Sequence, residues 1–79
     1  MADDLILLSL SDWDELNRSL FPRIPELLGD LSYHYYSEKS ELFVGISLAH
    51  IRQVVSEAKK RGVLAGTEAE RRVFALIGA

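Results

Sequence analysis

The sequence predicts a small two-layer α+β domain, with elements in the order β-α-β-β-α-α and a central helix at residues 48–61. A chain of 79 residues suffices for one small domain, spanning residues 1–79, and is too short for two. Apolar side chains recur at helical spacing along 48–61 and alternate along 41–46 as in a half-buried strand. The alternative is an all-α bundle of four to five helices, in which residues 25–36 form one continuous helix.

Signals for the start, the buried face and the end of the central helix agree. Ser47 is the expected N-cap, because its hydroxyl can accept a hydrogen bond from a first-turn N–H group. Gly62 suits the left-handed residue that ends a helix, and Val63 can close a Schellman contact there. The apolar stripe consists of Leu48, Ile51, Val54, Val55 and Ala58.

At the N-terminal end we expect a strand at 5–10 and a helix at 12–21. Ser11 is the candidate N-cap, and acidic residues in the first turn suit the positive end of the helix dipole. Trp13, Leu16 and Leu20 form its apolar face. Pro22 should end the helix, since the residue before a proline is disfavoured in the helical region.

Residues 25–28 are expected to form a short helical turn, followed by a hairpin of strands 31–36 and 41–46. Tyrosines alternate with Ser32 and His34 in the first strand, which favours a pleated, half-buried surface. In the second strand Leu42, Val44 and Ile46 share one face. A continuous helix through Gly29 is the competing interpretation and would cost about 1 kcal/mol relative to alanine there.

The last helix is expected at residues 68–77. Thr67 and Glu70 have the spacing of a capping box, in which the side chain of each residue accepts a hydrogen bond from the backbone N–H of the other. The side chains expected to face the core are Ala69, Val73, Leu76 and Ile77.

One internal similarity runs through the chain. The segment Leu8-Ser9-Leu10, followed by Trp13 and Leu16, matches Ile46-Ser47-Leu48, followed by Ile51 and Val54, at an offset of 38 residues. Both segments are typical of an extended residue that enters a helix through a serine cap. Because such a pattern is common, a true duplication of a strand–helix unit is the less favoured explanation.

The composition argues against catalysis. The chain has no cysteine and two histidines, so we expect no metal site and no thiol nucleophile. Its five glycines are scattered, so no glycine-rich phosphate loop is present, and we expect no cofactor and no enzymatic activity. Asp12 and Asp14 resemble a catalytic carboxylate pair, but acidic residues in the first turn of a helix are already explained by the helix dipole. The sequence contains no membrane span or signal peptide, and we expect a cytoplasmic protein.

Charge is distributed unequally along the chain. Nine acidic residues stand against three basic ones up to Glu41, and six basic against three acidic from Leu42 onward. This pattern predicts an acidic surface formed by Asp12, Asp14, Glu15 and Asp30, and a basic surface formed by Lys59, Lys60, Arg61, Arg71 and Arg72. Complementary surfaces of this kind can compensate each other within the fold or join neighbouring molecules head to tail.

We therefore expect a protein–protein interaction module whose partner is either another protein or a second copy of the chain, bound through these two surfaces with Tyr33, Tyr35 and Tyr36 as aromatic contacts. The three tyrosines cannot all face a core, so at least one should be exposed or covered by a partner.

The alternative function is a nucleic-acid accessory protein that uses the basic C-terminal helices. A helix-turn-helix built on Gly62 fails, because Glu68 and Arg71 occupy positions that must be apolar.

Overall fold

The computed structural model describes residues 4–29 and 33–78. It confirms a small α+β domain of three helices and an antiparallel three-stranded sheet, and the all-α alternative is wrong. In chain order the elements are β1 (Leu5–Ser9), α1 (Leu10–Arg18), two 3₁₀ turns (Phe21–Arg23 and Pro25–Leu27), β2 (Tyr33–Glu38), β3 (Glu41–Ser47), α2 (Leu48–Arg61) and α3 (Glu68–Ile77).

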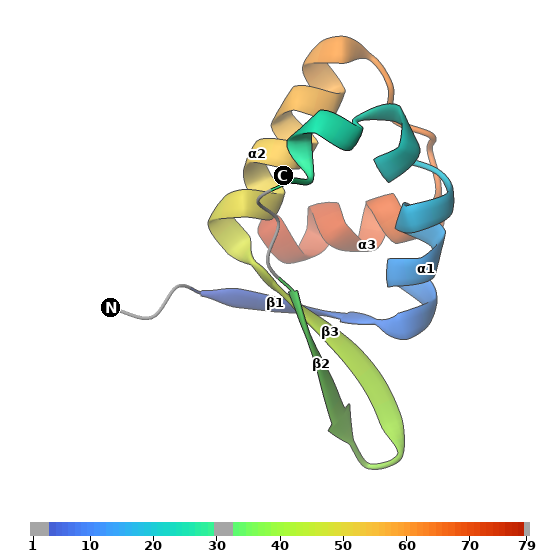
Figure 1. Cartoon of the computed structure of the whole chain (residues 1–79), viewed down its shortest axis with the longest axis vertical. Coiled ribbons are helices and arrows are strands. Elements are labelled where there is room, and N and C mark those ends of the chain that lie inside the picture. The colour runs from blue at the N-terminus through green and yellow to red at the C-terminus, as the bar shows by residue number, and fades with distance from the viewer. Residues whose placement is uncertain (1–3, 30–32, 79) are drawn as a thin grey trace.

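The sheet has the strand order β1-β3-β2, so β3 is central and the other two strands are edges. The helices lie together on one side of β1 and the adjoining half of β3, while the β2–β3 hairpin projects beyond them (Figure 1). Ile6 and Leu8 of β1 pair with Ile46 and Val44 of β3, and all four side chains are buried under the helices. This face of the sheet is one wall of the hydrophobic core.

Helix α1 begins and ends earlier than the sequence predicts. Its N-cap is Ser9, whose Oγ accepts a hydrogen bond from the Asp12 N–H at 3.2 Å, so β1 stops at residue 9 and the prediction of Ser11 as the cap is wrong. The helix ends at Arg18 rather than at residue 21. Ser19 is the C-cap, and its N–H and its hydroxyl both donate to the Glu15 carbonyl, at 2.9 and 2.6 Å.

The two similar segments each lie where a strand runs into a helix. Ser9 and Ser47 are both N-caps, at the ends of β1 and β3. In the antiparallel β1–β3 pair, Leu7 lies opposite Gly45, which is its equivalent at the offset of 38 residues. A local two-fold axis between these two residues therefore relates β1 to the paired part of β3, and each of the two strands runs into a helix.

The hairpin is built on a two-residue turn rather than on the four-residue loop predicted at 37–40. Lys39 and Ser40 have φ angles of 50° and 68°, as a type I′ turn requires at both central positions. Strand β2 extends to Glu38, and β3 begins at Glu41. The predicted strand residues 31 and 32 lie outside the described residues.

Helix α2 has the predicted bounds and the predicted buried face. Ser47 Oγ accepts a hydrogen bond from the His50 N–H at 3.4 Å, and Gly62 ends the helix at a φ of 69°. The Val63 N–H then donates to the Ala58 carbonyl at 3.1 Å, which completes the Schellman motif.

Helix α3 also has the predicted bounds, with two differences in detail. Thr67 Oγ1 accepts from the Glu70 N–H, but the buried Glu70 carboxylate accepts from the N–H groups of Ala65 and Gly66 instead of closing the capping box. Leu76, predicted to face the core, is 50% exposed. The connector before α3 is therefore fixed by a buried charge bound to two backbone donors.

Candidate protein-binding surface

A row of aromatic rings leads from the core onto the projecting hairpin. The ring centroids of Trp13 and Tyr33 are 4.8 Å apart, and those of Tyr33 and Tyr35 are 5.7 Å apart in an edge-to-face arrangement. Trp13 also contacts Phe21, with centroids 5.4 Å apart. Because Trp13 is 6% exposed and Tyr35 is 59% exposed, the row begins in the core and ends in solvent.

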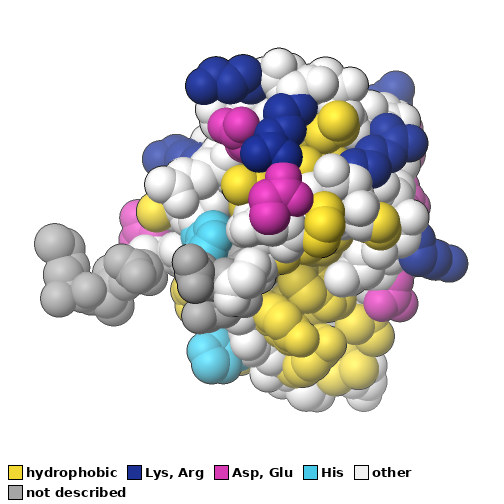
Figure 2. Space-filling view, turned by 45° about the horizontal axis from the view of Figure 1, so that its top comes forward, with side chains coloured by type: hydrophobic (Ala, Val, Ile, Leu, Met, Phe, Trp, Pro, Cys, Tyr) yellow, Lys and Arg dark blue, Asp and Glu magenta, His cyan; other side chains and the backbone are white. Residues whose placement is uncertain are grey.

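Leu42 continues this surface toward the turn, since it lies on the same face of the hairpin and is 49% exposed. A shallow groove of about 330 Å³ lies beside the rings, lined by Trp13, Asp14, Asn17, Phe21, Leu28, Tyr33 and Tyr35. We refer to Trp13, Tyr33, Tyr35 and Leu42 as the aromatic surface. Figure 2 shows hydrophobic side chains gathered in one continuous area toward the lower end of the molecule, with lysine and arginine side chains above and beside it.

The face of the sheet away from the helices is apolar as well. Leu5 and Leu7 of β1 are each about half exposed, and Tyr36 of β2 lies on this same face. A Cβ atom on Gly45 would lie 2.5 Å from a ring carbon of Tyr36, so the tyrosine ring rests directly on the glycine. The three predicted aromatic contacts are therefore all exposed and divided between the two faces of β2.

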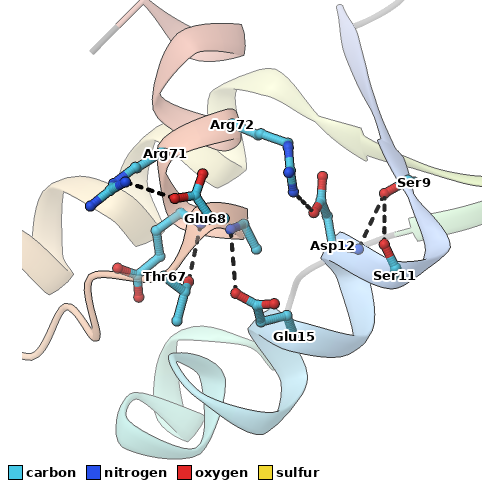
Figure 3. Close-up of polar contacts among 10 residues, drawn as sticks. Ser9, Ser11, Asp12, Glu15, Thr67, Glu68, Arg71 and Arg72 are labelled. Atoms are coloured by element: carbon cyan, nitrogen blue, oxygen red, sulfur yellow. Dashed lines mark hydrogen bonds and ion pairs between the residues drawn. The ribbon is translucent and has the colours of Figure 1, made fainter.

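The predicted acidic surface is largely used to hold α1 against α3. The Arg72 guanidinium donates to Oδ1 of the buried Asp12 at 2.5 Å, and Glu15 Oε1 accepts from the Ala69 N–H at 3.5 Å (Figure 3). An acid beside the start of α3 is stabilised by the helix dipole. Asp14 is exposed, and Asp30 lies outside the described residues.

Arg61 of the predicted basic surface is bound to two carboxylates. Its Nε donates to Glu57 at 3.1 Å, and its Nη1 donates to Glu26. The hydrogen bond from Arg61 lowers the pKa of Glu26 below its ordinary value. The pair links α2 to the 3₁₀ turn at Pro25–Leu27.

The other basic residues lie along α2 and α3. Arg71 donates to Glu68 at 2.7 Å, and the Lys59 ammonium lies 5.0 Å from the centroid of the Phe74 ring. Lys60 is exposed. Each arginine of the predicted basic surface thus contacts a carboxylate of the same chain, so much of the charge asymmetry is compensated within one molecule.

A larger open groove of about 530 Å³ lies beside α2 and the 3₁₀ turn Pro25–Leu27, lined by Leu27, His50, Arg52, Gln53, Val54, Ser56 and Glu57. Within residues 4–29 and 33–78, no group of three or more His, Cys, Asp or Glu side chains is arranged to hold a metal ion.

Sequence reasoning did not identify Trp13 and Leu42 as parts of a surface. Both were assigned to apolar faces, and only the structure shows that one lines a groove and the other lies beyond the helices. The polar run at 37–41 was the available signal, because a hairpin end that is polar on both faces must leave the core.

In the described part of the chain, no helix has both the length and the apolar character needed to cross a membrane. No family model matches the sequence, and no curated protein or solved structure matches it. Function must therefore be inferred from the surface of the chain itself.

Proposed function

We propose that this chain is a small protein–protein interaction module that binds its partner through the aromatic surface. The observation that supports this most strongly is the exposure of Tyr33, Tyr35 and Leu42 on one face of a hairpin, at 45%, 59% and 49%. Tyrosine is enriched at protein interfaces, because it buries a large ring while its hydroxyl keeps a hydrogen-bond partner. Adjacent exposed apolar side chains of this kind mark interaction sites in soluble domains.

The charged residues are the weaker choice for a docking surface. A partner that used Arg61, Arg71 or Arg72 would have to compete with the carboxylates that these side chains already contact. Association of that kind would weaken between low and high salt, because exposed charges are screened over about 8 Å at physiological ionic strength. Association through the aromatic surface should depend little on salt.

The nucleic-acid alternative makes the opposite prediction. Binding through Lys59, Lys60 and Arg61 would fall steeply with salt, since each neutralised phosphate releases counterions. A gel-shift titration at low salt distinguishes the two functions. We expect no shifted band, and a band lost on changing these three residues to glutamine would favour the alternative.

The proposed function is tested by affinity capture with matched baits. The test bait carries Tyr35→Ser with Leu42→Ser, and the control bait carries Leu76→Ser, because Leu76 is an exposed leucine on α3, outside the aromatic surface. Circular dichroism establishes that each bait is folded.

Proteins of the source cell retained by the unchanged bait should also be retained by the control, and should be lost from the double variant. The same set of proteins on all three baits would contradict binding through the aromatic surface.

A further inference from the structure

Among residues 4–29 and 33–78, no backbone group outside β3 is hydrogen-bonded to strand β2, which leaves a row of backbone groups along its outer edge. Glu38 and Glu41 flank a two-residue turn and are paired, so they exchange two hydrogen bonds. Because hydrogen-bonded and non-hydrogen-bonded pairs alternate, Tyr33, Tyr35 and Ser37 direct their N–H and C=O groups away from β3. All six residues of β2 are exposed, whichever face of the strand their side chains lie on.

This edge lacks the features that normally prevent strand pairing. Between Tyr33 and Ser37 there is no lysine and no proline, and the pairing with β3 continues without a bulge. The other edge strand, β1, contacts both α1 and α3 and runs directly into α1. An unprotected edge of aromatic residues is a template for another strand.

We propose that this strand is β2 of a second copy of the chain, paired antiparallel about a two-fold axis at Tyr35 to form a continuous six-stranded sheet. The proposal rests on the proposed function, because Tyr33 and Tyr35 of the aromatic surface lie on this strand and would take part in the contact. Only a register centred on Tyr35 pairs all three outward residues, placing Tyr35 opposite itself and Tyr33 opposite Ser37. Such a contact is self-complementary and closes at two copies.

The charges along the strand are compatible with this register. His34 lies opposite Tyr36 of the second copy, and no acidic residue faces another across the axis. The two hairpin turns point in opposite directions. At a rise of about 3.3 Å per residue, the Glu38 carboxylates of the two copies lie roughly 20 Å apart, well beyond the screening length.

The contact area indicates a weak dimer. Covering one aromatic side chain completely buries about 150–250 Å², so covering the exposed halves of three tyrosines on both copies buries roughly 600 Å². The strand backbones add to this area, and the total remains near the lower limit of specific interfaces, about 1,200 Å². We therefore expect reversible association in the micromolar range.

Sedimentation equilibrium from about 1 to 500 μM, at low and high salt, measures this association. The unchanged chain should shift from monomer to dimer with little dependence on salt. Ser37→Pro removes an outward N–H group while leaving every tyrosine and every β2–β3 hydrogen bond in place, and should weaken the dimer at least about tenfold. The controls Ser37→Thr, which keeps that N–H, and Leu7→Lys, on the opposite edge, should dimerise normally.

A charge exchange at Tyr35 tests the two-fold axis itself. Tyr35→Lys and Tyr35→Glu each place like charges opposite one another, so each variant alone should remain monomeric. An equimolar mixture should form heterodimers at least about tenfold more tightly than either variant alone.

An unchanged chain that is monomeric at every concentration would overturn the second-copy proposal, and the capture experiment would then decide the proposed function independently. A dimer that Leu7→Lys dissociates and Ser37→Pro does not would overturn it in favour of β1. A mixture of the two Tyr35 variants that stays monomeric would overturn the two-fold register.

Discussion

The two halves of β3 have the same alternation of apolar residues and opposite environments. Val44 and Ile46 are fully buried, whereas Leu42, on the same face, is 49% exposed. Strand β1 flanks β3 from Phe43 onward and helices α1 and α2 contact it, but Glu41 and Leu42 have β2 as their only paired strand. Alternation therefore defines the faces of a strand, while the overlying helices determine how far along the strand a core extends.

The largest expected effect separates these halves directly. Ile46→Ala should lower the free energy of unfolding by about 2–5 kcal/mol, because it leaves a cavity under the helices. Leu42→Ala should change it by less than about 0.5 kcal/mol, since the side chain already contacts water. Urea denaturation of the dilute monomer measures both values.

Ile46→Val is the fallback for the first variant if Ile46→Ala does not fold, with an expected loss of about 0.5–1.5 kcal/mol. Equal losses for the Ile46 and Leu42 variants would mean that the hairpin end is covered in solution.

A smaller effect should locate the boundary between the two regions on β2. Tyr33→Ala removes the ring that contacts Trp13 and should cost about 0.5–1.5 kcal/mol. Tyr35 is the next residue along β2 on the same face, and Tyr35→Ala should change the free energy of unfolding of the dilute monomer by less than about 0.5 kcal/mol. Thermal melts at protein concentrations below those at which the chain dimerises measure the difference. A larger loss of stability for Tyr35→Ala than for Tyr33→Ala would show that the boundary does not lie between these two residues.

The smallest effect concerns the turn. Lys39 and Ser40 adopt positive φ angles that favour asparagine and glycine, so Lys39→Asn with Ser40→Gly should stabilise the hairpin by about 0.5–1 kcal/mol. Chemical denaturation of the double variant should show this gain, and a loss of stability would be inconsistent with a type I′ turn.

Sequence patterns were sufficient where local signals agree with one another. The N-cap at Ser47, the apolar stripe and Gly62 all act within a few residues of α2, so its bounds follow from the sequence. The start of α1 was misplaced because Ser9 and Ser11 are both good caps. The choice depends on β1 ending where its pairing with Phe43 ends, which is a tertiary contact.

The candidate surface was less accessible to sequence reasoning, because it depends on which side chains meet across the fold. Asp12 and Arg72 are sixty residues apart and pair only after α1 and α3 have packed, so one member of each predicted patch is used in an intrachain contact. Leu42 was placed on the correct face, but its exposure depends on the length of the helical layer. The number of tyrosines within four residues predicted that at least one is exposed, and the structure exposes all three.

The most direct test of an uncovered β2 edge is hydrogen exchange of individual backbone amides at two protein concentrations about a hundredfold apart. In the dilute monomer His34, Tyr36 and Glu38 should exchange slowly, because they donate to β3, and Tyr33, Tyr35 and Ser37 should exchange quickly. At high concentration the second set should slow as well, with no change on β1. An alternation that persists at both concentrations, or slowing confined to Leu5 and Leu7, would contradict the account.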